Sequence, residues 1–125
     1  MRTIRTSRGL LRRWLTLWLE DRRRARAAAH AVPTVPNTPV LTGFDVVTYV
    51  QLNWQDLSDN ELGFRLYRKE NPAAYSLYQT FGPNVTSYQD FGIVALHLYY
   101  YYVTAFNAVG ESAPSNEISV LAGSS

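Results

Sequence analysis

Apolar and polar residues alternate with a period of two along most of the chain after residue 39, and this alternation predicts β-strands. Clusters of Gly, Pro, Asn, Asp and Ser separate the apolar runs and predict turns. The predicted strands span residues 40–45, 47–54, 63–69, 74–81, 85–89, 98–107 and 116–121. Seven short strands without helical periodicity between them predict an all-β sandwich.

The beginning of the chain follows a longer period, which predicts an amphipathic α-helix over residues 7–26. Leucine and tryptophan fill one side of this helix, and arginine fills much of the other. Ser7 is a suitable N-cap, and Glu20 and Arg24 have the spacing of a favourable ion pair. The residues expected to bind a partner are Leu11, Trp14, Leu15, Trp18, Arg22, Arg23 and Arg24.

These two patterns predict how the chain is divided. The expected parts are a basic helical arm at 1–32, a proline-rich linker at 33–39, the sandwich at 40–122 and a tail at 123–125. The prolines of the linker favour a stiff, extended polyproline II conformation. We therefore expect the linker to separate the arm from the sandwich.

The second half of the sandwich has a characteristic order of motifs. Residues 86–120 read TSYQDFGIVALHLYYYYVTAFNAVGESAPSNEISV, which resembles the second half of a fibronectin type III domain, particularly the bacterial and phage variety. That family typically reads D-x-G-L, a Tyr, then Y-x-V-x-A-x-N-x-x-G-x-S, then S-N and a last strand. Earlier, VQLNW and GFRLYR resemble its strands B and C. The resemblance covers residues 37–122 and implies a seven-stranded immunoglobulin-like β-sandwich.

The resemblance also assigns the run of four tyrosines at 99–102. Tyr99 takes the tyrosine-corner position, whose hydroxyl bonds to the nearby backbone. The alternation then gives an expected core of Trp54, Leu66, Tyr99, Tyr101, Val103 and Ala105, and an outward-facing set of Tyr100, Tyr102, Thr104 and Phe106. Side chains of the neighbouring strands, such as Arg65 and Tyr67, would cover the outer rings, or the rings would contact a partner. The candidates for such a contact are Tyr100, Tyr102, Phe106 and Leu96.

The turn before Tyr99 departs from the family pattern. The family usually has Pro or Gly there, whereas residues 93–98 read IVALHL. Some of these side chains must face outward, so we expect an apolar patch at this end of the sandwich, covered by the arm or by a partner.

Charge is distributed unevenly along the chain. Residues 1–32 carry nine arginines against Glu20 and Asp21, a net charge of +7, while residues 33–125 carry three basic residues against eight acidic ones, a net charge of −5. A basic arm joined to an acidic domain indicates that the arm binds a partner. The absence of cysteine excludes disulfides, thiolate chemistry and cysteine-based zinc sites.

The sequence carries no convincing pattern for catalysis. The acidic cluster at Asp56, Asp59 and Glu61 does not have the spacing of a calcium-binding loop. Acidic residues are common in turns, so the cluster predicts a turn. No nucleophile has an evident base, and there is no glycine-rich phosphate loop. We predict a non-enzyme with no cofactor, no metal and no small-molecule substrate.

Three interpretations of the arm remain open. It docks in a groove of a partner protein, lies on a membrane surface, or packs back on its own domain. A cleaved signal peptide is not expected, because the apolar run at 14–19 is too short and charges follow it directly. Nucleic-acid binding is not expected either, since it would leave the leucines and tryptophans exposed.

These observations lead to three hypotheses for function. In the first, the protein is a structural component of a large assembly, a phage virion put together in the host cytoplasm. The sandwich would decorate the capsid or belong to the tail, and the arm would bind a protein partner, with self-association also open. The second is an adhesion module of the bacterial envelope with its helix on the membrane. The third is a carbohydrate-binding accessory module, for which exposed aromatic rings are the hint.

Overall fold

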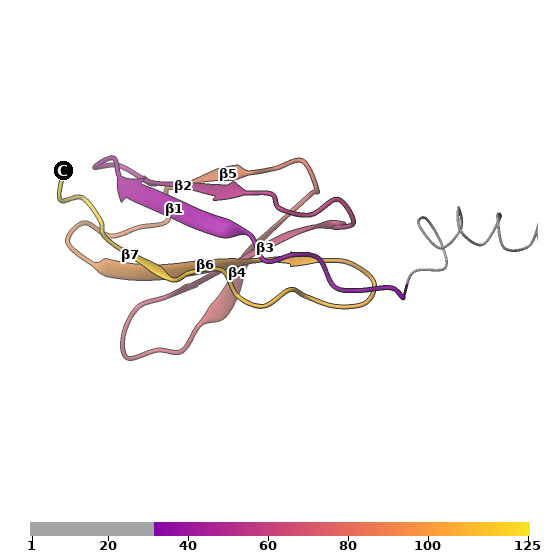
Figure 1. Cartoon of the computed structure of the whole chain (residues 1–125). Coiled ribbons are helices and arrows are strands. Elements are labelled where there is room, and N and C mark those ends of the chain that lie inside the picture. The colour runs from indigo at the N-terminus through magenta and orange to yellow at the C-terminus, as the bar shows by residue number, and fades with distance from the viewer. Residues whose placement is uncertain (1–31) are drawn as a thin grey trace, which may run out of the picture. The chain divides into compact units, whose positions relative to one another are not determined.

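The computed structural model describes residues 32–125, so the predicted arm helix and its seven candidate binding residues lie outside the described part. Seven strands in two layers make up the described part (Figure 1). They are β1 (Val40–Asp45), β2 (Val50–Gln55), β3 (Gly63–Lys69), β4 (Ser76–Phe81), β5 (Ser87–Asp90), β6 (Leu98–Phe106) and β7 (Ile118–Leu121).

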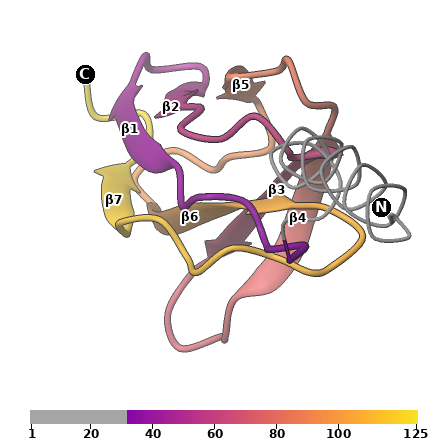
Figure 2. The same cartoon turned by 45° about the vertical axis from the view of Figure 1, so that its right-hand side comes forward.

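The strands form two antiparallel sheets that face each other. One has the order β1-β2-β5 and the other the order β4-β3-β6-β7. Figure 2 shows the two layers. The predicted seven-stranded β-sandwich is confirmed.

Alternate residues of the strands pack between the sheets, because a strand of period two presents one face to the core. Across the pairs Leu41–Trp54, Leu66–Val103 and Tyr99–Val120, both partners are buried. The buried apolar cluster comprises Leu41, Val50, Leu52, Trp54, Phe64, Leu66, Tyr99, Tyr101, Val103, Ala105, Val120 and Ala122. All six residues expected in the core from the sequence belong to this cluster.

The second strand begins later than the sequence predicted. Residues 47–49 were expected in it, but the strand starts at Val50, and Val46 to Tyr49 form the turn from β1. The backbone N–H of Val46 donates to the Tyr49 carbonyl, and Val47 has a positive φ of 68°. Val46-Val47-Thr48 resembles a strand in composition, yet the pairing of Asp45 with Val50 requires a tight turn here.

The last strand begins at Ile118, two residues later than predicted, and serine side chains bond to β6 before it begins. The buried Ser112 and Ser115 accept hydrogen bonds through Oγ from the N–H groups of Ala105 and Val103, at 3.0 and 2.9 Å. Their own N–H groups donate back to the carbonyls of the same two residues. The side chains therefore satisfy strand β6 where β7 has not yet begun.

Residues on both sides of the strands are tied to the sandwich. The Thr34 carbonyl accepts hydrogen bonds from Asn60 at 3.1 Å and Asn107 at 2.9 Å, and the sandwich unit begins at Thr34. Part of the segment expected to be a linker thus lies against the loops. At the other end of the strands, the Asp45 carboxylate accepts from the N–H groups of Gly123, Ser124 and Ser125.

Candidate interaction surfaces

The four tyrosines at 99–102 alternate between the core and the outer face of the sheet. Tyr99 and Tyr101 are buried, while Tyr100 and Tyr102 are partly exposed. The N–H of Val94 donates to the Tyr99 hydroxyl at 2.8 Å, which is the geometry of a tyrosine corner.

Side chains of the adjacent strands cover the outer rings. Tyr102 stacks on Tyr67 with ring centroids 4.6 Å apart and meets Tyr75 edge-on, also at 4.6 Å. The Arg65 guanidinium lies 4.2 Å from the centre of the Phe106 ring. These contacts support the interpretation that the rings cover one another and do not form an open platform.

Thr104 faces outward, as the alternation predicted, but it is buried on that face. Its hydroxyl donates to Glu111 at 2.7 Å, and Tyr67 donates to the same carboxylate oxygen at 2.7 Å. Arg65 binds the second oxygen at 2.9 Å. Glu111 therefore covers Thr104 and joins strands β3 and β6 across the outer face.

The Glu111 cluster changes the acidity of its members. Partial burial alone would raise the pKa of Glu111, but hydrogen bonds from Tyr67 and Thr104 and the nearby Arg65 lower it below its ordinary value. Burial and the hydrogen bond to Glu111 raise the pKa of Tyr67 to about 12. Glu111 is thus held as a carboxylate, and Tyr67 as a neutral phenol.

A second carboxylate cluster lies inside the sandwich. Asp90, the last residue of β5, has no exposed surface. It accepts hydrogen bonds from Tyr78 and Tyr101 at 2.7 Å and forms an ion pair with Arg68 at 2.9 Å. The N–H of Gly92 donates to it at 2.9 Å. Every lone-pair direction that the buried charge offers is therefore used.

Local geometry of β3 and β4 brings this cluster together. Leu66 pairs with Gln79 and Tyr67 with Leu77, so Tyr78 is an extra residue in a β-bulge, and a bulge re-aims a side chain. Burial and a hydrogen bond to Asp90 raise the pKa values of Tyr78 and Tyr101 above the ordinary value of a tyrosine. Burial alone would lower the pKa of Arg68, but Asp90 raises it.

The Asp90 cluster was not predicted from the sequence, because Asp-x-Gly was interpreted only as part of the family pattern. The available signal was the alternation in GFRLYRK: if Leu66 faces the core, so does Arg68, and a buried arginine needs a carboxylate.

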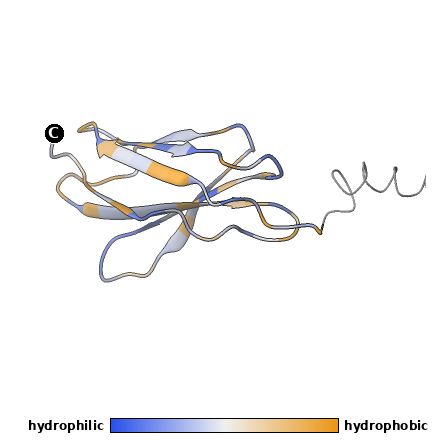
Figure 3. Ribbon diagram, viewed as in Figure 1, coloured by the Kyte–Doolittle hydropathy of each residue, from blue (hydrophilic) through white to orange (hydrophobic). Residues whose placement is uncertain are grey.

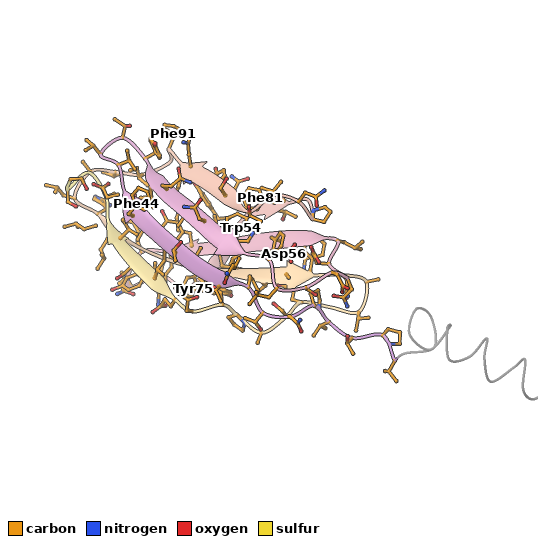
Figure 4. All side chains as sticks on the ribbon, turned by 45° about the horizontal axis from the view of Figure 1, so that its top comes forward. Phe44, Trp54, Asp56, Tyr75, Phe81 and Phe91 are labelled. Atoms are coloured by element: carbon orange, nitrogen blue, oxygen red, sulfur yellow. The ribbon has the colours of Figure 1, made fainter. Side chains whose placement is uncertain are left out.

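The apolar patch expected before Tyr99 is present at the end of the strands near Ser125. We call this surface the apolar end, and its exposed residues are Val47, Phe91, Val94, Leu96, Leu98 and Leu121. In Figure 3 the hydrophobic colour marks parts of the loops at this end of the strands. Figure 4 shows Phe44 and Phe91 toward this end and Asp56 toward the other. Leu98 pairs with Leu121, and Leu96 donates its N–H to Ala122. The residues therefore belong to neighbouring segments.

In the acidic loop between β2 and β3, polar side chains form hydrogen bonds to the backbone, as is typical of turns. Asp56 accepts from the N–H of Ser58 at 3.0 Å, and Asn60 binds Thr34. Residues 32–125 contain no group of three or more His, Cys, Asp or Glu placed to share a metal ion. In the same part of the chain, no helix is long and apolar enough to cross a membrane.

Solved structures share this arrangement of strands. A Fn3-like protein from Clostridium thermocellum is 22% identical to this chain, with a TM-score of 0.60, over 71% of this chain and 95% of its own. The fold is that of a fibronectin type III domain. The chicken CNTN1 FN1-FN3 domains match 73% of this chain with a TM-score of 0.63 and 15% identity, over 33% of their own length.

The fibronectin type III fold also matches part of some enzymes. A β-1,2-glucanase from Parabacteroides distasonis is 26% identical over 74% of this chain, with a TM-score of 0.60, but the match covers only 14% of the glucanase. No family model matches the sequence, and neither does a curated protein. The fold alone does not assign a function.

Proposed function

We propose that the protein is a non-catalytic structural component of a phage virion, in the capsid decoration or the tail. Its fibronectin type III sandwich is the displayed module, and residues 1–32 anchor it to a protein of the assembly. The arm binds through Leu11, Trp14, Leu15 and Trp18, while Arg22, Arg23 and Arg24 steer it by charge.

The contrast in charge between the arm and the sandwich carries this proposal. In residues 32–125, all three basic side chains are engaged: Arg65 with Glu111, Arg68 with Asp90, and Lys69 over the rings of Tyr75 and Tyr100. The sequence of the arm, by contrast, concentrates nine arginines beside a Leu-Trp pattern, and this composition suits an anchor.

Co-sedimentation with candidate phage particles and with anionic liposomes tests the anchor. Changing Trp14 and Trp18 to Ala should abolish binding to the particle, whereas changing Arg22, Arg23 and Arg24 to Gln should only weaken it. Arg2→Gln with Arg5→Gln serves as a charge control outside the predicted helix. Liposome binding that is tight and is lost in the Arg22–Arg24 variant would overturn the virion anchor and favour an envelope module with a membrane-surface helix.

A carbohydrate-binding accessory role is the second candidate, because neighbours of this fold include a glucanase and a pectate lyase bound to tetragalacturonic acid. Tyr100 and Phe106 would then contact the sugar. Polysaccharide pull-down with the wild type and with Tyr100→Ala tests this role. Specific binding that Tyr100→Ala removes would favour it over the virion proposal.

A further inference from the structure

The outer face of the β1-β2-β5 sheet presents polar side chains without charge. Alternate residues of these three strands point away from the core, and the polar ones among them are Thr42, Gln51, Asn53, Gln55, Ser87 and Gln89. The outer face of the other sheet, by contrast, carries Arg65, Lys69 and Glu111. We call the uncharged surface the amide face, and Figure 4 turns its sheet toward the viewer.

The register of the strands places the polar side chains of the amide face side by side. Asn53 of β2 pairs with Thr42 on one side and with Ser87 on the other, and Gln51 pairs with Gln89. Residues directly opposite each other point to the same face, with Cβ atoms about 5 Å apart. The amides and hydroxyls therefore form one continuous patch across the three strands.

The hydrogen bonds among these side chains are long. Gln89 Nε2 donates to Gln51 Oε1 at 3.4 Å, and Gln51 Nε2 donates to Asn53 Oδ1 at 3.4 Å. The Thr42 hydroxyl donates to the Asn53 carbonyl, also at 3.4 Å. Strong N–H···O bonds are about 2.7–3.2 Å long, and each amide offers two donors and two lone pairs. Much of the hydrogen-bonding capacity of the amide face is therefore open to a ligand.

A hollow of about 210 Å³ lies on the amide face, and its lining residues are Val40, Thr42, Asn53, Trp54 and Gln55. Val40, which is 43% exposed, gives the hollow an apolar side. Phe44, which is 56% exposed, lies four residues further along β1, about 13 Å away. A ligand that fills the hollow and extends along β1 would therefore reach a second apolar side chain.

The chemistry of the hollow favours a neutral ligand that is rich in hydroxyl groups. A charged ligand would find no counter-charge among the outward side chains of β1, β2 and β5. A sugar hydroxyl both donates and accepts hydrogen bonds, as a side-chain amide does, and the C–H groups of a sugar ring suit Val40 and Phe44. The hollow is smaller than the pockets of about 300–1,000 Å³ that enclose drug-sized ligands, so it fits one ring of a longer chain.

We propose that the amide face binds a neutral oligosaccharide, with one sugar unit in the hollow at Asn53 and Gln55 and the rest of the chain along β1 toward Phe44. The site does not involve the arm, so it goes beyond the anchoring role and does not depend on it. It also lies on the sheet opposite to Tyr100 and Phe106, the sugar contacts of the second candidate function.

An NMR titration of the full chain tests the proposal. The neutral probes are cellohexaose, laminarihexaose, maltohexaose, xylohexaose and mannohexaose, and the anionic probe is tetragalacturonic acid. At least one neutral probe should shift the side-chain NH₂ signals of Asn53 and Gln55, and tetragalacturonic acid should bind at least about tenfold more weakly. Unchanged signals with all five neutral probes, or equal binding of the anionic one, would overturn the proposal.

Two variants locate the site. Asn53→Ala with Gln55→Ala should bind the selected oligosaccharide at least about tenfold more weakly than the wild type. Gln55→Glu keeps the shape of an exposed side chain at the end of β2 and adds a charge, so it should also weaken binding even if the double variant does not fold. Thr80→Ala with Ser119→Ala, at two exposed positions of the other sheet, is the control and should bind as the wild type does.

Three results would contradict the site. Wild-type affinity in the folded Asn53–Gln55 variant or in Gln55→Glu would remove the hollow from the binding surface. Binding that Tyr100→Ala abolishes and the Asn53–Gln55 variant keeps would place the sugar on the other sheet. Signals of the amide face that shift with protein concentration alone, and not with sugar, would assign this face to contacts between copies. Co-sedimentation with particles tests the anchor separately, so the two proposals can fail independently.

Discussion

Asp90 and Glu111 have almost the same set of partners but opposite positions in the sandwich. Each carboxylate binds one arginine at 2.9 Å and two hydroxyl groups at 2.7 Å. Asp90 lies in the core with no exposed surface, whereas the Glu111 side chain is 32% exposed on the outer face.

The comparison shows that the surroundings, and not the number of hydrogen bonds, decide what a polar cluster contributes. Water can replace the partners of Glu111 if one is lost, and salt screens its charge. Asp90 has no surface exposed to solvent, so the loss of any partner leaves a charge or a hydroxyl unsatisfied in the core. We therefore expect the same substitution to have a much larger effect at the inner cluster.

The largest effect is expected for Asp90→Ala, which should lower the free energy of unfolding by about 3–5 kcal/mol, because it leaves Arg68 partly buried without its counter-charge. Urea denaturation of the full chain measures this loss. Combining Asp90→Ala with Arg68→Met should recover part of it. A loss below about 1 kcal/mol would contradict the importance given to the inner cluster.

A smaller effect is expected for Tyr101→Phe, which deletes one hydroxyl and leaves the ring in place. The lost hydrogen bond to a buried carboxylate should cost about 1.5–3 kcal/mol. Tyr67→Phe is the matched change at the outer cluster and should cost less. Equal losses in the two variants would mean that burial does not distinguish the clusters.

Alkaline pH should weaken the fold through the tyrosines of both clusters. The pKa of Tyr67 rises from 10.0 to about 12 on folding, and the pKa values of Tyr78 and Tyr101 are also raised. Above pH 10 the unfolded chain loses these protons while the folded chain keeps them. The free energy of unfolding should therefore fall as the pH rises from 10 to 12.

Urea denaturation at a series of alkaline pH values measures this slope. The double variant Tyr67→Phe with Tyr101→Phe should show a shallower slope than the wild type. An unchanged slope would assign the alkaline loss to other groups.

The smallest effect is expected for Glu111→Gln, at about 1 kcal/mol or less, because the Arg65–Glu111 pair is close to solvent. High salt should reduce the difference between this variant and the wild type, whereas it should leave the effect of Asp90→Ala nearly unchanged. Chemical denaturation at low and high salt provides the measurement, and a salt-independent loss would count against the comparison.

The sequence predicted the strands and the core well, because both follow from an alternation that each strand carries locally. It failed at residues 47–49, where Val47 and Thr48 favour a strand but the pairing of β1 with β2 imposes a turn. It placed Thr104 on the outer face but did not predict its burial, because alternation gives the face of a strand and not what covers that face. Glu111, which covers Thr104, comes from the next loop.

The surfaces were harder to predict than the core. The apolar patch could be expected from IVALHL, because those residues are too apolar for a solvated turn. The Asp90 cluster could not be read from local spacing, since its members come from β3, β4, β5 and β6 and meet only through the β-bulge at Tyr78. The contacts of the arm stay a prediction, because they depend on residues outside the described part.

The attachment of Thr34 to Asn60 and Asn107 has a mechanical consequence. If the arm is held and the apolar end is pulled, the load enters near Thr34 and runs along β1. The hydrogen bonds between β1 and β2 lie across that direction, so they share the force together and do not open one after another. Asn116 adds a clamp, with bonds of 2.8 Å to the N–H and the carbonyl of Leu41. The strand that receives the tension is thus loaded in shear, a geometry that resists rupture.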